Sequence, residues 1–234
     1  MSWIAQAQSL GIILTRYQIN QFADYETMLM AWNQKMNLTA VHEPALIQQR
    51  HFLDSLTCIP VMGDLNGRSV IDVGTGAGFP GLPLKILFPH MSLTLVESVE
   101  KKTRFLAAVI ESLQLKDVAV VVDRVEALGR LTAYREQFDW AVARALADMR
   151  VLVEYLLPLC RIGGKMLAQK GPYAPVELES ALEAIEILGG GEVTLESVQL
   201  PAYEDSRFIV VIPKVTATPE RYPRRVGIPS KRPL

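Results

Sequence analysis

The strongest constraint on the fold is a glycine-rich turn that follows a short buried strand. Ser69-Val-Ile-Asp-Val73 is apolar but for two positions, as expected for a strand covered on both faces of a sheet. Glycines follow at positions 74, 76, 78 and 81. Their missing side chains let the backbone turn sharply and bring N–H groups against a ligand at the start of the next helix. The sequence therefore predicts a strand–turn–helix unit that binds a ligand.

Two ligand classes fit this turn. Gly76-x-Gly78-x-x-Gly81 is a dinucleotide fingerprint, whereas Asp72-x-Gly74-x-Gly76-x-Gly78 is the pattern of S-adenosylmethionine-dependent methyltransferases. A pyrophosphate needs only amides and the helix dipole. The methionine end of S-adenosylmethionine also carries an ammonium, which an acid such as Asp72 can attract. The residues favour the methyltransferase, and an NAD(P)-dependent oxidoreductase stays the alternative.

Downstream of a turn cluster at residues 63–67, short apolar segments alternate with helical patterns. The predicted strands are Ser69–Val73, Ser92–Glu97, Val118–Val122, Asp139–Ala143, Lys165–Gln169, Glu192–Val198 and Phe208–Ile212, and helices are expected near 81–88, 100–114, 148–160 and 175–188. Such alternation implies right-handed crossovers and a mostly parallel sheet. A loop joins the last two strands, which predicts a terminal antiparallel hairpin. The expected fold is α/β, the Rossmann-like seven-stranded plan of class I S-adenosylmethionine-dependent methyltransferases.

The two ends of the chain differ from this middle part. Residues 16–35 and the stretch from Pro44 to Thr57 have helical periodicity, which predicts an N-terminal helical extension. We expect three parts: the extension at 1–66, a methyltransferase domain at 67–213 and a basic tail at 214–234. The tail holds six basic residues and one acidic residue, although the whole chain has a formal net charge of -1. This asymmetry suggests a polyanion partner, and a solvated, disordered end is the alternative.

Other bulk features restrict the location of the protein. No apolar run approaches the length of a membrane span, and the N-terminus lacks the basic region of a signal peptide. Cys58 and Cys160 lie in apolar stretches that we interpret as helical, so buried thiols in a reducing cytoplasm are expected. The three histidines lack metal-ligand spacing, which predicts no metal. The charge balance favours a monomer.

Further donor-binding candidates follow the later strands. Glu97 ends the second strand, where an acid accepts hydrogen bonds from the ribose hydroxyls of an adenosine. The third strand leads into Asp123-Arg-Val125-Glu126, the region that frames the adenine in this fold. Arg144 closes the fourth strand at the sheet edge where ligands bind. It would hold an RNA phosphate or the donor's carboxylate, and an ion-paired surface arginine is the alternative.

The end of the fourth strand also bears on the methyl acceptor. It reads Ala143-Arg144-Ala145-Leu146, which is not the Asn/Asp-Pro-Pro-aromatic clamp for exocyclic amines, and it has no cysteine for covalent attack on a pyrimidine. A suitable acceptor is therefore one that is nucleophilic without help. Guanine N7 has an in-plane lone pair and loses no proton on methylation, so alignment matters more than a general base.

The chain resembles the glucose-inhibited division protein B family in motifs that run from about residue 30 to the C-terminus. The motifs are Asn37-Leu-Thr-Ala-Val41, His51-Phe-Leu-Asp54-Ser55-Leu56, Asp72-Val-Gly-Thr-Gly-Ala-Gly-Phe-Pro-Gly81-Leu-Pro83, Leu95-Val-Glu-Ser-Val-Glu-Lys-Lys102, Ala143-Arg-Ala145, Lys170-Gly171 and Arg221-Tyr-Pro-Arg-Arg225…Pro233-Leu234. Members of this family, also described as methyltransferase G of the small subunit, are 16S ribosomal RNA guanine-N7 methyltransferases.

The resemblance implies an acceptor, a donor site and RNA contacts. The acceptor would be N7 of guanine 527 in the 530 loop of 16S rRNA, in the small ribosomal subunit, and the products would include S-adenosylhomocysteine. The resemblance implies donor binding by Gly74, Phe79, Val125, Glu126 and Arg144, with Glu97 as a ribose contact, and Arg144 is also the candidate catalytic residue. The glycine turn itself adds Asp72, Gly76 and Gly78 to the donor-binding candidates. The implied RNA-binding residues are Lys101, Lys102, Arg224 and Arg225.

Three points stay open beside the resemblance. Asp123 departs from the small polar residue of many relatives, which affects the expected adenine contact. His51 and Asp54 lie three apart on one helical face, and we interpret them as helix–sheet packing or a lid over the donor rather than as catalysts. A noncatalytic ribosome-assembly factor that keeps a donor pocket is the second alternative to the methyltransferase.

Overall fold

A computed structural model describes residues 2–200, 204 and 206–234, which include a seven-stranded sheet with the order β3-β2-β1-β4-β5-β7-β6. Its strands are β1 (Ser69–Val73), β2 (Ser92–Val96), β3 (Val118–Val121), β4 (Phe138–Arg144), β5 (Cys160–Lys170), β6 (Thr194–Val198) and β7 (Arg207–Pro213). The strands from β1 to β5 pair in parallel, whereas β7 is antiparallel to both β5 and β6. The predicted sheet and its terminal hairpin are confirmed.

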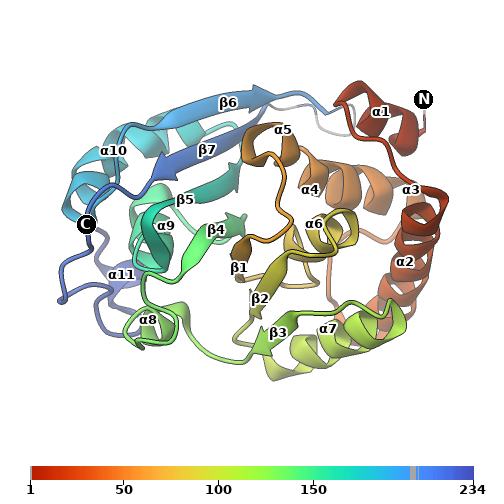
Figure 1. Ribbon diagram of the computed structural model, residues 1–234, viewed down its shortest axis with the longest axis horizontal. Helices are drawn as coiled ribbons and strands as arrows, with labels where there is room; N and C mark the ends of the chain where they lie inside the picture. The colour runs from red at the N-terminus through yellow and green to blue at the C-terminus, as the bar shows by residue number, and fades with distance from the viewer. Residues whose placement is uncertain (1, 201–203, 205) are drawn as a thin grey trace.

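Helices cover both faces of the sheet (Figure 1). They are α1 (Trp3–Ser9), α2 (Arg16–Met36), α3 (Pro44–Ile47), η1 (Gln48–Leu53), α4 (Asp54–Leu56), α5 (Ile59–Met62), α6 (Gly81–Leu87), α7 (Glu100–Ser112), α8 (Val125–Leu128), α9 (Met149–Leu156), α10 (Ala174–Ile187) and α11 (Ile228–Lys231). Alternate residues of β1 divide between two buried clusters: Val70 packs with the N-terminal helices, and Ile71 packs with α9 and α10. The period of two along the strand therefore sets the two layers.

The N-terminal helices complete one of these layers. A capping box between Thr15 and Gln18 starts α2, which contacts α6 and α7 on the sheet. The predicted helix from Pro44 exists as α3, η1 and α4 in direct succession, and its middle part is a π-helix from Gln48 to Leu53. Such π-helical insertions are frequent at functional sites. This one contains His51.

The structure corrects one boundary of the sequence interpretation. The helix expected over 148–160 ends at Leu156, because Pro158 lacks the N–H that a further turn would need. Cys160 therefore begins β5 and does not lie in a helix. Cys58 lies between the short helices α4 and α5 rather than in one of them. Both cysteines are free and buried, as expected.

The C-terminal segment, residues 214–234, is folded against the domain over its whole length. Its disordered alternative is wrong, because Lys214, Thr218 and Tyr222 are buried and α11 contacts α9. Gly129 packs so closely on Pro223 that a Cβ atom there would lie 2.7 Å from the ring. Buried residues therefore fix the backbone path of this segment, while Arg221, Arg225, Lys231 and Arg232 are exposed.

Candidate active site

The glycine turn is organised by the carboxylate of Asp72 at the end of β1. One carboxylate oxygen accepts hydrogen bonds from the Thr75 hydroxyl at 2.6 Å and from the Gly81 N–H at 2.8 Å. The other oxygen is buried and has no hydrogen-bond partner among the described residues. Burial raises the pKa of Asp72 to about 6, against the hydrogen bonds from Thr75 and Gly81 that lower it. Asp72 thus ties the first residues of the turn to the start of α6.

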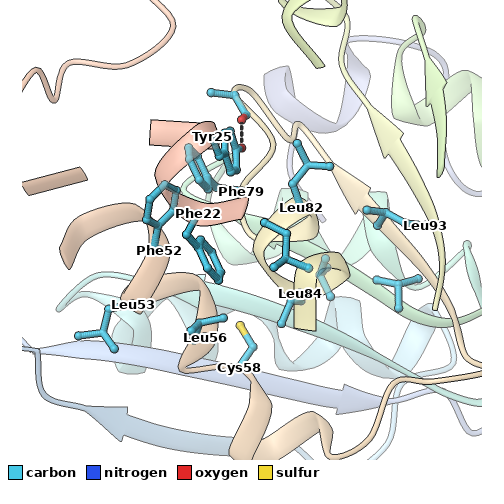
Figure 2. Close-up of a cluster of buried hydrophobic side chains, with 14 of the residues drawn as sticks. Phe22, Tyr25, Phe52, Leu53, Leu56, Cys58, Phe79, Leu82, Leu84 and Leu93 are labelled. Atoms are coloured by element: carbon cyan, nitrogen blue, oxygen red, sulfur yellow. Dashed lines mark hydrogen bonds between the residues drawn. The ribbon is translucent and has the colours of Figure 1, made fainter. Parts of the chain in front are cut away.

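The path of the turn favours glycine at two further positions. Gly74 has φ +66°, and a Cβ atom there would lie 2.5 Å from the Leu146 side chain. Gly78 has φ +99°, and a Cβ atom would collide with Leu82 and with the Tyr25 hydroxyl. The Tyr25 hydroxyl donates to the carbonyl of Ala77, as Figure 2 shows. The N-terminal extension therefore holds the turn directly.

Glu97, the predicted ribose contact, also binds the backbone of this turn. Its two carboxylate oxygens accept hydrogen bonds from the N–H groups of Gly76 at 3.1 Å and of Val99 at 2.9 Å. Lys102 lies 3.8 Å from the same carboxylate. The side chain is nearly buried. Glu97 links the turn after β1 to the loop after β2.

Two cavities open at the carboxyl ends of the strands, and Gly74 lines both. The smaller one has a volume of about 250 Å³ and contains Val125, Glu126 and Tyr155 among its lining residues. The larger one has a volume of about 380 Å³, and Gly76 and Phe79 lie in its wall. Leu146 lies between them, over Gly74. Asp72, Gly78 and Glu97 line neither cavity and support the turn from behind.

Three arginines give the larger cavity its charge. Arg50 from η1, Arg144 from the end of β4 and Arg207 from the start of β7 all line it. Among the residues that the structure describes, none that lines it is a carboxylate. Because guanidinium groups recognise carboxylates and phosphates in a planar fork, this cavity suits an anionic group.

Arg144 is the centre of this cluster. It donates to the Arg50 carbonyl at 2.9 Å and to the Asp54 carboxylate at 3.0 Å, and its guanidinium lies 4.9 Å from the ring centre of Phe79. Asp54 is 2% exposed and also lies 3.8 Å from Arg207. Arg144 thus connects the end of β4 to the helix that begins at Pro44. The sequence motifs alone do not predict this contact.

His51 stacks on Phe79 with a centroid distance of 4.6 Å, and its Nε2 atom lies 2.7 Å from the Thr39 hydroxyl. Burial, together with the nearby charge of Arg144, lowers the pKa of His51 to about 4. The ring is therefore neutral near pH 7, which fits a packing role better than proton transfer.

The four predicted RNA-binding residues lie in two places. Lys101 and Lys102 lie in the first turn of α7, and Lys101 is exposed whereas Lys102 faces Glu97. Arg225 is exposed. Arg224 forms a two-pronged ion pair with Glu154, whose side chain is 0% exposed, at 2.6 and 3.0 Å. Neighbouring arginines of one motif thus have different surroundings.

Sequence reasoning missed several residues of these cavities. Thr39 lies within the motif Asn37–Val41 and Arg50 directly precedes the motif that begins at His51, but neither residue was assigned to the site. Arg207, Tyr155 and Ser230 carry no local signal and reach the cavities only through the fold. In the part of the chain that the structure describes, no group of His, Cys, Asp and Glu could hold a metal ion. Within the same residues, no helix is long and apolar enough to cross a membrane.

Solved structures show which fold the chain shares with known proteins. An S-adenosylmethionine-dependent O-methyltransferase from Thermotoga maritima aligns with a TM-score of 0.56 and 14% identity, over 82% of this chain and 72% of that one. A tRNA (m1A58) methyltransferase from Aquifex aeolicus aligns with a TM-score of 0.55 and 16% identity, over 70% and 69%. The fold is therefore that of the class I S-adenosylmethionine-dependent methyltransferases.

The sequence places the chain within that class. Residues 18–206 match the family model GidB, described as rRNA small subunit methyltransferase G. Proteins named ribosomal RNA small subunit methyltransferase G are 52% identical in Roseiflexus castenholzii (97% of either chain) and 44% identical in Alkaliphilus metalliredigens (97% of this chain and 95% of the relative). The chain belongs to the rRNA small subunit methyltransferase G family, and its donor is S-adenosylmethionine rather than NAD(P).

Proposed function

We propose that this enzyme transfers a methyl group from S-adenosylmethionine to N7 of a guanine in 16S rRNA, in the 530 loop at guanine 527. The observation that carries the proposal is the larger cavity, which is lined by three arginines and meets the smaller cavity at Gly74. A polyanionic acceptor and a donor can thus approach each other at the glycine turn.

The cavities fit the two halves of the donor. Asp123, Glu126 and Tyr155 offer oxygen atoms to an adenosine in the smaller cavity. Gly76 has φ +60°, and a Cβ atom there would find no neighbour nearer than 4.0 Å, so the turn leaves room for a ligand. Bound S-adenosylmethionine supplies an electrophilic methyl group. Gly76, Phe79 and Arg144 line the side that would receive the methionine part and the acceptor.

The lining of the larger cavity agrees with an acceptor that needs no base. The titratable side chains among its described lining residues are the three arginines and His51, whose pKa is about 4. Guanine N7 attacks through its own lone pair, and no proton leaves. The protein then needs only to align guanine N7 with the methyl group of the donor. Arg144 can contribute to this alignment because Asp54 and the Arg50 carbonyl fix its guanidinium. Arg144 is the proposed catalytic residue in this sense.

RNA contacts extend outward from this cavity. Arg50, Arg144 and Arg207 would hold phosphates next to the target nucleotide, and Lys101, Lys102 and Arg225 would add contacts farther away. Arg224 contributes to RNA binding mainly by fixing the segment that carries Arg225, since its own charge is paired with Glu154. RNA affinity should therefore fall steeply as salt concentration rises.

The decisive experiment analyses 16S rRNA from cells that lack the protein. Borohydride and aniline cleave RNA at N7-methylguanine, so cleavage at guanine 527 should be absent in the deletion strain and return with the wild-type gene. An Arg144→Lys variant should restore cleavage about 100-fold more slowly, because one amine cannot replace the planar fork. Arg150→Lys, at an exposed ion pair with Asp148, is the matched control and should restore it fully.

A second measurement addresses the noncatalytic assembly factor. Purified protein is incubated with labelled donor and unmethylated small subunits. Label at N7 of guanine 527 supports the enzyme, whereas donor binding without label in rRNA would support the assembly factor. We further propose that the protein is a monomer and that it lies in the cytoplasm. The two free buried thiols favour the reducing cytoplasm. Sedimentation equilibrium should give the mass of one chain.

A further inference from the structure

The C-terminal segment contacts residues of the domain that are far from it in the sequence, such as Arg135, which is 87 residues before Tyr222. Lys214 anchors its start, because its ammonium is buried, donates to the Leu188 carbonyl at 2.9 Å and lies 3.4 Å from Glu136. Arg135 then donates to the carbonyl of Tyr222 at 2.7 Å. In the first contact a side chain of the segment reaches the domain, and in the second a side chain of the domain reaches the backbone of the segment, so contacts in both directions fix its path.

A buried ion pair fixes the segment just before it reaches the cavity. The Arg224 guanidinium and backbone N–H both bind Glu154 on α9, the N–H at 2.7 Å. A charge as buried as Glu154 requires such a partner. Three residues later, Gly227 turns the chain with φ +78°, a conformation that favours glycine. The segment then runs into α11.

The turn at Gly227 contacts a predicted donor-binding residue. The Gly227 N–H donates to the Glu126 carboxylate at 2.8 Å, and the Tyr155 hydroxyl lies 3.4 Å from the same oxygen. Ser230, in α11, lines the smaller cavity together with Gly74. The Gly227 N–H thus helps to orient Glu126, and α11 contributes Ser230 to the lining of the cavity.

We infer that residues 227–231 form a wall of the donor site and position Glu126 toward the adenosine half of the donor. The smaller cavity is the adenosine half because its acids and hydroxyls suit ribose and adenine, whereas the arginines of the larger cavity suit anionic groups. The segment that sequence predicts as an RNA-binding tail is therefore part of the donor pocket. This role concerns donor binding and does not depend on the acceptor proposed above.

The test removes the wall and measures donor binding without RNA. A variant that ends at Gly227 keeps the ion pair of Arg224 and the hydrogen bond to Glu126 but loses Ser230. Calorimetry with S-adenosylhomocysteine and with methylthioadenosine, which lacks the amino acid end, should show Kd raised about tenfold for both, a loss of about 1.4 kcal/mol. Wild-type affinity for both ligands in the folded variant, or a loss confined to S-adenosylhomocysteine, would overturn the inference.

A pair of point variants keeps the test independent of folding. Ser230→Phe places a bulky side chain at the cavity wall and should weaken both ligands at least tenfold. Lys231→Phe adds the same side chain at an exposed neighbour that does not line the cavity, and should bind as the wild type does. Thermal unfolding checks that both variants fold. Equal affinities in the two variants would remove Ser230 from the donor pocket.

Discussion

Asp72 and Glu97 are both buried at the glycine turn, and both bind backbone N–H groups rather than facing a cavity. The arguments that selected them from the sequence, attraction of an ammonium and contacts to a ribose, describe roles that stay predictions. Their present contacts have a simpler consequence. They hold a glycine-rich loop in one conformation before any ligand arrives, which reduces the entropy lost on binding.

Asp72 leads to a prediction about pH and stability. Its folded pKa of about 6 lies above the ordinary value of 3.8, so the folded state binds the proton more tightly than the unfolded state. Its contribution to the free energy of unfolding therefore increases as pH falls through 6. Between pH 7.5 and pH 5 the wild type should gain about 1 to 2 kcal/mol relative to Asp72→Asn.

Urea unfolding of both proteins at the two pH values measures this difference. His51 titrates in the opposite sense, because its pKa is lowered to about 4, and it destabilises the fold as pH falls below 6.5. It is present in both proteins, so its effect cancels in the comparison. A difference between the two proteins that does not change with pH would contradict the raised pKa of Asp72.

Arg224 and Arg225 give a second prediction at the scale of single residues. Arg224→Ala leaves the carboxylate of Glu154 buried without its partner and should reduce the free energy of unfolding by about 3 kcal/mol. Arg225→Ala removes an exposed charge and should change stability by less than about 0.5 kcal/mol while weakening RNA binding. Equal destabilisation by both substitutions in urea titrations would exclude the ion pair as the cause.

Among the elements, the turn between β1 and α6 allows the effect of a substitution on stability to be separated from its effect on ligand binding. Gly76→Ala meets no neighbouring atom, so it should cost only the strain of a positive φ, about 1 to 2 kcal/mol. The new methyl group would nevertheless occupy space beside the larger cavity, and we expect binding of S-adenosylhomocysteine to fall at least tenfold.

Gly67→Ala is the matched control for this substitution. Gly67 has φ +76°, and a Cβ atom there would also find open space, but the residue lies away from both cavities. Thermal unfolding should show similar losses for the two variants, whereas calorimetry should show weaker binding only for Gly76→Ala. Normal binding by a folded Gly76→Ala protein would place the ligand away from the turn.

The helix from Pro44 to Leu56 shows how an element acquires a functional role through its partners. Its π-helical middle part brings Arg50 and His51 to the larger cavity, and Asp54 receives Arg144 from β4. Helical periodicity predicts that such a helix has an apolar face. The functional contacts of its polar residues exist only in the folded protein, where this helix packs against the carboxyl end of the sheet.

For the whole molecule, the three predicted parts (extension, domain and tail) share buried clusters and do not each have a core of their own. Phe22, Tyr25 and Phe52 of the extension share one buried cluster with Phe79 of the glycine turn, as Figure 2 shows. The C-terminal segment contributes Tyr222 to the other cluster. Each predicted part thus supplies core residues to its neighbours, although the division itself stays a prediction.

A fragment of residues 67–234 tests this view of the molecule. Loss of the N-terminal helices would expose one face of the sheet and the turn, which should prevent cooperative unfolding and S-adenosylhomocysteine binding. Circular dichroism during heating and calorimetry provide the measurements. A fragment that melts cooperatively and binds the ligand would show that the extension is a separate unit.

The sequence by itself determined the α/β class, the seven strands with their terminal hairpin, the glycine turn and the family. Each depends on local signals: alternating burial, strand and helix lengths, and residues close together along the chain. Local signals also mislead at a boundary, as at Pro158, where an apolar run resembled a continuing helix. The donor-binding motifs were recognisable because their residues share a strand end or a single loop.

Only the tertiary structure decided which distant residues meet. Arg144 and Asp54 are 90 residues apart, and Gly227 and Glu126 are 101 apart, yet each pair forms a hydrogen bond. Parallel strands direct their carboxyl ends to one edge, but the pairing of side chains there depends on how helices pack across long crossovers. That packing also fixes which charges are buried, and burial gives Arg224 and Arg225 different surroundings.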